Sequence, residues 1–186
     1  KATQYEGAYV KDPDLGLHKW IVSFDLNSLY PHLIMQYNIS PETYYDVKTS
    51  GVNVDNMLSQ QVNLKFAKDK NITIAPNGAM FRRDKQGFLP ELMEKMYGDR
   101  VIYKKKMMEA KKEFQKTKDP IYKNEIARCH NIQMAKKIAL NSAYGAIGNQ
   151  YFRYFDVKQA EAITLGGQLS IRWIERDVNK FMNKVL

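Results

Sequence analysis

The sequence lacks the features that mark several special classes of protein. Its 186 residues include one cysteine, Cys129, which excludes an intrachain disulfide and fits a reducing compartment. The three histidines, His18, His32 and His130, lie far apart in sequence, so no Cys/His cluster has the spacing of a zinc site. No apolar run reaches the roughly 18 residues of a membrane span, and no signal-peptide pattern opens the chain. We therefore expect neither a disulfide scaffold nor a membrane protein.

What the sequence has in excess is positive charge. Lys and Arg number 29 against 20 for Asp and Glu, which gives a formal net charge of +9. The excess favours a polyanionic partner such as nucleic acid or a nucleotide, although an ordinary solvated basic face is the alternative. No Walker-type glycine-rich loop is present to hold a phosphate. The chain starts at Lys1 and stays helix-like to Leu186, so we expect both ends to be cut from a longer polypeptide.

The first third of the chain predicts strands around one short helix. Residues 8–11 are a short strand candidate, and the nearly continuous apolar run at 19–26 (KWIVSFDL) predicts a buried strand. A short helix is expected at 33–37, and residues 40–70 are polar and weakly periodic. Strands at 72–74 and 79–81 flank Pro76-Asn77-Gly78, and Asn-Gly is a strong hairpin signal.

Helical periodicity dominates the remainder. Long helices are expected at 89–116, 121–147 and 157–185. The break at 117–120 ends in a proline that suits the first turn of the next helix, and Asp156 is expected to cap the last helix. The sequence therefore predicts an α+β fold in which a small sheet carries a long antiparallel helical hairpin and a following helix.

A helical wheel of residues 121–147 predicts two faces. One face is small and apolar and comprises Ile132, Ala135, Ala139, Ala143 and Ala146. The opposite face is polar and aromatic and comprises His130, Gln133, Lys137, Asn141 and Tyr144. Plain solvent exposure is the alternative interpretation of the polar face, although asparagine is a poor choice for an exposed helix interior.

Cations gather on the preceding helix. Arg100 and Lys104 stand four residues apart on one helical face. From Arg100 to Lys118 the chain has eight Lys/Arg residues and two Glu residues. If the two helices pack antiparallel, Arg100, Lys104 and Lys137 can converge on a triphosphate, because Arg and Lys both bind phosphate oxygens. A solvated lysine-rich face is the equally simple alternative.

Asp25 stands at the end of the apolar run 21–24. A carboxylate there is costly unless it is paired or bound to a cation, and such carboxylates commonly bind Mg²⁺. The alternative is that Asp25 caps the short helix that follows. Position alone does not separate the two.

Several short segments of the sequence resemble the motifs of a known protein family. Residues 25–31 (DLNSLYP) resemble motif A of family B DNA polymerases, and residues 137–145 (KIALNSAYG) resemble motif B. Arg100 and Lys104 match the fingers helix of the family, and residues 5–8 (YEGA) resemble its Y-x-G-G/A motif. Residues 152–156 and the last helix look most similar to replicative polymerases of tailed phages. The sequence departs from the family pattern in ending before any motif C, because no D-T-D triplet occurs.

The resemblance implies a role for each matching residue. Asp25 would be the catalytic carboxylate that binds two Mg²⁺ ions, helped by the Leu26 carbonyl, and Tyr30 would exclude a 2′-hydroxyl from the sugar position. The triphosphate would be bound by the amides of Ser28 and Leu29 and by Arg100, Lys104, Lys137 and Asn141. The DNA would be contacted by Tyr5, Gly7, Tyr144 and Gly145.

The resemblance also implies an organisation and a setting. Residues 1–88 would be a palm portion with motif A, residues 89–148 the fingers hairpin, and residues 149–186 a return to the palm. The chain would be part of a DNA-directed DNA polymerase that uses dNTPs and primer–template DNA in replication, in the cytoplasm of a phage-infected cell. Its expected partners are the exonuclease, motif C palm and thumb domains, and a sliding clamp through the parent protein.

One aspartate cannot build a two-metal site, so carboxylates outside this chain would complete it and the chain alone would be inactive. The alternatives are a non-catalytic basic helical module that binds nucleic acid, or one half of a split polymerase.

Overall fold

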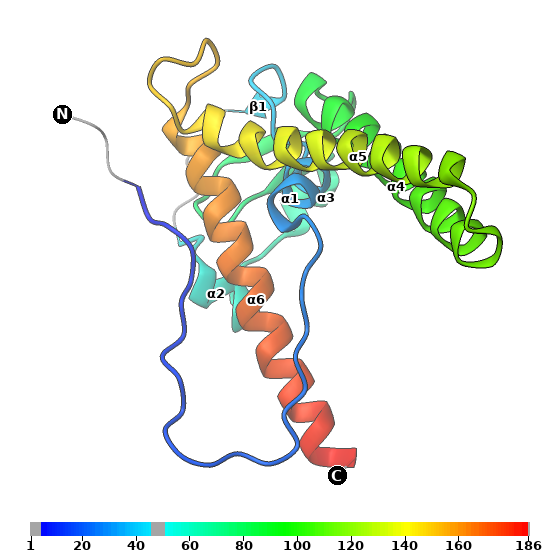
Figure 1. Cartoon of the computed structure of the whole chain (residues 1–186). Coiled ribbons are helices and arrows are strands. Elements are labelled where there is room, and N and C mark those ends of the chain that lie inside the picture. Colours follow the sequence, from blue (N-terminus) through cyan, green and yellow to red (C-terminus); the bar gives the residue numbers. More distant parts are fainter. Residues whose placement is uncertain (1–4, 46–50, 186) are drawn as a thin grey trace.

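The computed structural model describes residues 5–45 and 51–185, which form six α-helices and one three-stranded sheet (Figure 1). The helices are α1 (Leu29–Tyr37), α2 (Val54–Leu58), α3 (Lys65–Asp69), α4 (Phe88–Thr117), α5 (Pro120–Ile147) and α6 (Val157–Val185). The strands are β1 (Tyr44–Tyr45), β2 (Ile72–Ile74) and β3 (Met80–Arg82). The predicted α+β class is confirmed.

Helices α4 and α5 form a long antiparallel hairpin that projects from the body as an arm (Figure 1). Helix α4 ends where Lys118 adopts a left-handed conformation, with φ of 58°. Helix α5 begins with Pro120 in its first turn, where a missing N–H costs nothing. The Asp119 side chain accepts a hydrogen bond of 2.9 Å from the Ile121 amide and caps the helix. The predicted helices and the predicted break between them are confirmed.

The small sheet has the strand order β1-β3-β2 and is antiparallel throughout. Gly78 supplies the positive φ of 80° in the turn between β2 and β3, and the Ala75 amide donates to the Ala79 carbonyl at 2.8 Å. The hairpin predicted from Asn77-Gly78 is therefore confirmed. Strand β1 and helices α2 and α3 occupy the segment that was predicted only to be polar and weakly periodic.

The sheet separates two apolar clusters, because successive side chains of a strand point to opposite faces. Phe81 faces the larger cluster, which joins residues of α1, α4, α5 and α6. Met80 faces a smaller cluster that α3 covers. Helix α6 approaches α1 closely because Gly166 and Gly167 present no side chain to Leu33 and to Tyr30. One core thus draws on all three predicted segments, whose division at 88/89 and 148/149 stays a prediction.

The strands predicted at 8–11 and 19–26 are wrong for this chain. Residues 5–27 have no strand or helix, and no backbone hydrogen bond joins 19–26 to another described segment. Apolar side chains of this run are exposed, with 87% of Trp20 and 78% of Ile21 accessible. A strand needs a neighbour to pair its amides and carbonyls, and the described residues place none beside this run.

The helical wheel of α5 was also partly wrong. Gln133, predicted on the polar face, is only 7% exposed, whereas Ala135 of the predicted packing face is exposed. The buried stripe runs instead through Cys129, Gln133, Leu140 and Ile147. Leu140 and Ile147 lie in the larger apolar cluster, so the packing surroundings and not the polarity of the residue decide which face is covered.

Candidate functional site

The first turn of α1 is tied to α4 by a cation. Ser28 precedes α1 in a left-handed conformation with φ of 53°, and its carbonyl accepts from the His32 amide at 3.1 Å and from His32 Nδ1 at 2.9 Å. Arg100 of α4 donates from Nη1 to the Ser28 Oγ at 3.0 Å. This bond spans 72 positions of the sequence and brings a predicted fingers residue to a predicted motif A residue.

A cavity of about 470 Å³ opens between the start of α1 and the last turns of α5. It is lined by Ser28, Leu29, Tyr30, Pro31, Asn141 and Tyr144. Two segments more than a hundred residues apart thus share one concave surface, and both are segments singled out in the sequence.

The Tyr30 ring is held from two sides. It lies against the Tyr144 ring with centroids 4.6 Å apart and planes tilted by 44°. Behind it stands Gly167 of α6, where an added Cβ would lie 3.0 Å from the Tyr30 Cε1. Burial raises the pKa of the Tyr30 phenol and so favours its neutral form. The result is a fixed, uncharged aromatic wall at the cavity.

Tyr144 is linked to the N-terminal segment. Its hydroxyl lies 3.2 Å from the Tyr5 hydroxyl, and the Tyr5 hydroxyl in turn occupies the space beside Gly148, where an added Cβ would come within 2.5 Å of it. Burial, and next the hydrogen bond with Tyr5, raise the pKa of Tyr144 far above its usual range. The predicted DNA-contacting tyrosines therefore form one hydrogen-bonded pair.

Helix α6 fixes the residues that follow Tyr5. The Thr164 hydroxyl donates to the Glu6 carbonyl at 2.8 Å. The Gln168 amide donates to the Glu6 side chain at 3.0 Å and to the Gly7 carbonyl at 2.8 Å. Sequence reasoning missed Thr164, Gln168 and Gly167, although the adjacent glycines inside a helix were a usable signal of close packing.

The cations near the site differ in their surroundings. The Arg100 Nε is buried and has no hydrogen-bond partner among the residues that the structure describes. Lys136 forms a 2.8 Å ion pair with Asp99, which lowers the pKa of that carboxyl and links α5 to α4. Lys104 and Lys137 are exposed and have no ion pair within residues 5–45 and 51–185.

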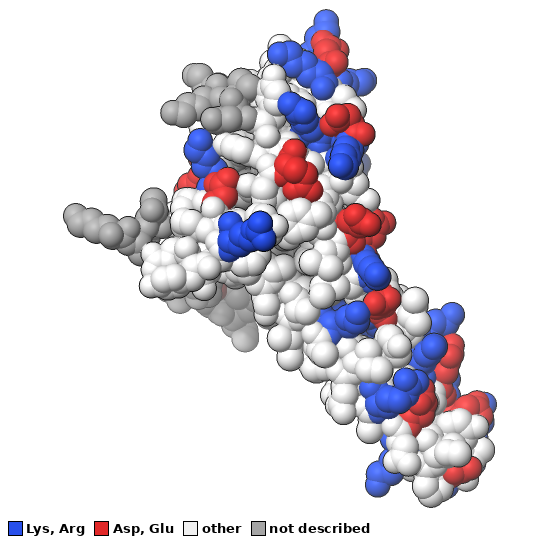
Figure 2. Space-filling view, turned by 90° about the horizontal axis from the view of Figure 1, so that it is seen from above, with Lys and Arg blue, Asp and Glu red and all other residues white. Residues whose placement is uncertain are grey.

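The charge on the arm is mixed. Figure 2 shows basic side chains along the arm with acidic side chains interspersed among them. This arrangement matches a solvated face with local cations, and not a continuous patch of one sign.

Comparisons with known proteins show the family of the chain. A family model described as DNA polymerase family B matches residues 1–185. The chain belongs to DNA polymerase family B. It is 30% identical to the DNA-directed DNA polymerase of Escherichia phage RB69 over 97% of this chain and 24% of that protein. It is also 34% identical to DNA polymerase 1 of Pyrococcus abyssi over 98% of this chain and 20% of that protein. The chain therefore spans about a quarter or less of the length of these relatives.

Within this family B chain, Asp25 is placed differently from the prediction. Its side chain is exposed and follows an irregular segment instead of a strand. The capping alternative also fails, because Ser28 occupies the N-cap position and no side-chain cap bond is formed there. Among the described residues, no group of three or more His, Cys, Asp or Glu side chains could hold a metal ion.

The predicted site residues of this polymerase-family chain thus divide into two sets. Those that meet at the cavity or are bonded to its lining are Ser28, Leu29, Tyr30, Asn141, Tyr144, Arg100 and Tyr5. Those that the structure leaves outside the lining are Asp25, Leu26, Lys104, Lys137, Gly145 and Gly7. In the part of the chain that is described, no helix is both long and apolar enough to cross a membrane.

Proposed function

We propose that the chain is the palm and fingers portion of a template-directed DNA polymerase. In this proposal the cavity between α1 and α5 receives an incoming dNTP for transfer to a primer 3′-hydroxyl. The single observation that carries it is the shared cavity of residues 28–31, Asn141 and Tyr144, to which Arg100 is bonded through Ser28. Membership in DNA polymerase family B supports the same reaction class.

Arg100 is the proposed cationic phosphate ligand nearest the cavity. Its Nη1 reaches Ser28 at the cavity edge, and its buried Nε has no partner among the described residues, which is costly for a cationic group. A triphosphate oxygen would provide that partner through a charge-assisted hydrogen bond. Asn141 would add a neutral donor from α5, and the exposed ammonium groups of Lys104 and Lys137 would meet the triphosphate when the arm closes on it.

Tyr30 is the proposed selector for the sugar. Its ring is confined by Tyr144 and by Gly167, so it has little room to retreat from a 2′-hydroxyl. A ring that cannot move excludes a ribonucleotide by steric clash with its 2′-hydroxyl, whereas a mobile side chain would move aside and admit it.

Asp25 is the proposed contribution of this chain to metal binding. Its carboxylate is a hard oxygen ligand of the type that Mg²⁺ prefers, and its exposure leaves it accessible. Ions bound there would supply charge neutralisation at the triphosphate. The described residues fit one ligand of a two-ion site and not the whole site, so the proposal needs carboxylates from outside the chain.

Primer–template DNA is the proposed second substrate, contacted by Tyr5, Gly7, Tyr144 and Gly145. The proposed partners are the exonuclease, motif C palm and thumb domains of the parent enzyme, and a sliding clamp. Because the metal site is incomplete, we expect the purified chain to give no templated incorporation. Incorporation by the chain alone would contradict this point.

The first experiment measures incorporation and DNA affinity in the complete polymerase. We expect Asp25→Asn to lower incorporation at least about a hundredfold, because a lost ligand removes transition-state charge neutralisation. The affinity for primer–template should stay within about twofold. Asp12→Asn is the matched control, since Asp12 is an exposed aspartate on the same irregular segment, and it should change neither. Equal activity of the two variants would refute the proposal.

A second experiment separates the polymerase from a non-catalytic basic module. Lys137→Ala should raise KM for dNTP with little change in salt-dependent DNA binding. Lys136→Ala is the control, because Lys136 is paired with Asp99 and is not assigned to the nucleotide. If Lys137→Ala instead weakens DNA binding as much as dNTP use, the basic-module interpretation is favoured.

A further inference from the structure

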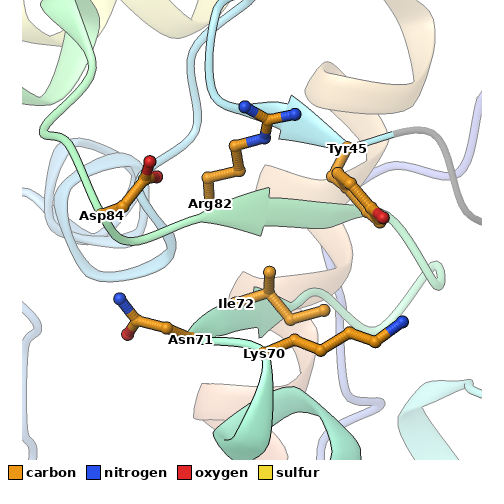
Figure 3. A pocket seen from close by; sticks show the side chains of 6 residues that line it. All are labelled: Tyr45, Lys70, Asn71, Ile72, Arg82 and Asp84. Atoms are coloured by element: carbon orange, nitrogen blue, oxygen red, sulfur yellow. The ribbon is translucent and has the colours of Figure 1, made fainter.

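A second hollow lies at the edge of the small sheet, on the face of the smaller apolar cluster. It measures about 370 Å³ and is lined by Tyr45, Lys70, Asn71, Ile72, Arg82 and Asp84 (Figure 3). None of these residues lines the cavity between α1 and α5. The family resemblance of the sequence was carried by other segments, so this hollow has no assigned role.

Basic side chains outnumber acidic ones in the lining of the hollow, where Lys70 and Arg82 stand against Asp84. Lys70 and Arg82 are exposed, and neither side chain has an ion pair within residues 5–45 and 51–185. Asp84 also lines the hollow but forms no ion pair in the described part of the chain. From Lys65 to Lys85 the sequence holds six basic and two acidic residues, so the local charge is clearly positive.

The hollow also offers a flat aromatic surface. Tyr45 is half-buried and packs against the smaller apolar cluster, which anchors its ring. The Arg82 guanidinium lies 5.6 Å from the centroid of that ring, as a cation–π pair. In Figure 3, the Lys70 ammonium and the Tyr45 hydroxyl lie toward the same end of the hollow, while Asn71 and Asp84 lie at the other.

An anchored aromatic ring, a planar guanidinium and a neighbouring ammonium are the groups that bind unpaired nucleic acid. The ring and the guanidinium stack on a base of any sequence, and the ammonium neutralises its phosphate. A volume of about 370 Å³ lies in the range of small-ligand sites, about 300–1,000 Å³. It suits one unstacked nucleotide, and a base pair inside a duplex cannot enter it.

We propose that this hollow binds a nucleotide of single-stranded DNA, with the base on the Tyr45–Arg82 pair and the phosphate at Lys70. The inference rests on the proposed function, because a template-directed polymerase must handle a template strand that is not yet paired. It assigns a second contact for that strand, separate from the dNTP cavity.

The test measures binding of a fluorescein-labelled twelve-nucleotide oligo-dT to the purified chain by anisotropy over a series of salt concentrations. We expect the Lys70→Ala/Arg82→Ala variant to bind about fivefold or more weakly, with a salt slope smaller by about 0.7, because Lys70 is the one cation placed at a phosphate and each phosphate contact on a single strand contributes about 0.7. Lys180→Ala/Lys184→Ala is the matched control, since it removes two exposed charges from the far end of α6, and it should bind as the parent chain does. Equal affinities and slopes in the two double variants would overturn the proposal.

Two milder changes test the stacking and the charge separately. Tyr45→Phe keeps the ring and should bind within about twofold of the parent, whereas Tyr45→Leu should lose about fivefold or more for single strands and little for a duplex. Asp84→Asn should tighten binding, a gain that misfolding cannot produce. If Tyr45→Leu is silent and Asp84→Asn does not tighten binding, the hollow is not a nucleotide site.

The two proposals fail in distinguishable ways. Oligo-dT binding is measured without dNTP and without Mg²⁺, so it does not depend on the dNTP cavity. Suppose that Asp25→Asn keeps full incorporation while the Lys70→Ala/Arg82→Ala variant still binds oligo-dT more weakly. The polymerase assignment is then refuted, and the assignment of the hollow as a nucleotide site is supported. The reverse pattern refutes the assignment of the hollow as a nucleotide site and leaves the polymerase assignment intact.

Discussion

Replacing Gly167 with alanine tests the close packing of α6 against the start of α1. The added Cβ would lie 3.0 Å from the Tyr30 Cε1 and 3.7 Å from the Leu29 Cδ2. The Tyr30 ring must then move by a few tenths of an ångström, and Tyr144, with its centroid at 4.6 Å, stands on the other side of it.

The magnitude follows from two opposing effects. Alanine inside a helix is favoured over glycine by about 0.5–1 kcal/mol. Overpacking of a filled site costs about 1–3 kcal/mol. We therefore expect Gly167→Ala to lower the free energy of unfolding by roughly 1 kcal/mol, within a range from about zero to 2.5 kcal/mol.

The matched control is Gly98→Ala in α4. Nothing lies within 4 Å of a Cβ added at Gly98, so only the helix preference remains. We expect this variant to be more stable than the parent chain by up to about 1 kcal/mol. Urea unfolding, with the m value checked for constancy, measures both differences.

The outcome that would refute the reasoning is a Gly167→Ala variant as stable as Gly98→Ala. That result would mean that the Tyr30 ring has space to move, and it would also remove the physical basis for Tyr30 as a rigid wall. In the complete polymerase, the displaced ring should also change the preference for dNTP over ribonucleotide.

Two further predictions concern a helix cap and a buried phenol. Asp119→Ala removes the cap bond to the Ile121 amide and should lower the free energy of unfolding by about 1 kcal/mol in urea titrations, whereas Asp119→Asn should lose much less. Because the folded state raises the pKa of Tyr144, its stabilising contribution is complete below the ordinary tyrosine value near 10 and declines as pH rises beyond it. Unfolding free energies measured between pH 8 and about 11 should fall less steeply in Tyr5→Phe, and a slope equal to that of the parent chain would contradict the Tyr5 contribution.

The helices could be predicted from sequence because their information is local. The boundaries predicted for α4, α5 and α6 differ from those observed by at most a residue or two, since periodicity, Pro120 and Asp156 mark them directly. The turn at Asn77-Gly78 was predictable for the same reason.

The irregular structure of residues 19–26 could not be predicted, because apolar residues show that a segment is suited to burial and not that a partner is present. Gln133 shows the same limit in a helix, since its burial depends on the facing helix and not on its own polarity. The cavity itself was partly predictable. The resemblance named most of its lining, but no local pattern encodes the contact of Tyr144 with Tyr5 across 139 positions.

The hydrogen bonds from α6 to Glu6 set an order of events during synthesis. Thr164 and Gln168 bind Glu6 across 158 and 162 positions of the chain. At about 5–20 residues per second, a ribosome needs roughly 8 to 30 s to make the intervening chain. During that time Glu6 has neither of these partners. Tyr5 likewise lacks its contact with Tyr144 until that residue, 139 positions later, has been synthesised. Residues 5–7 therefore gain these contacts only after α5 and the first half of α6 have been synthesised.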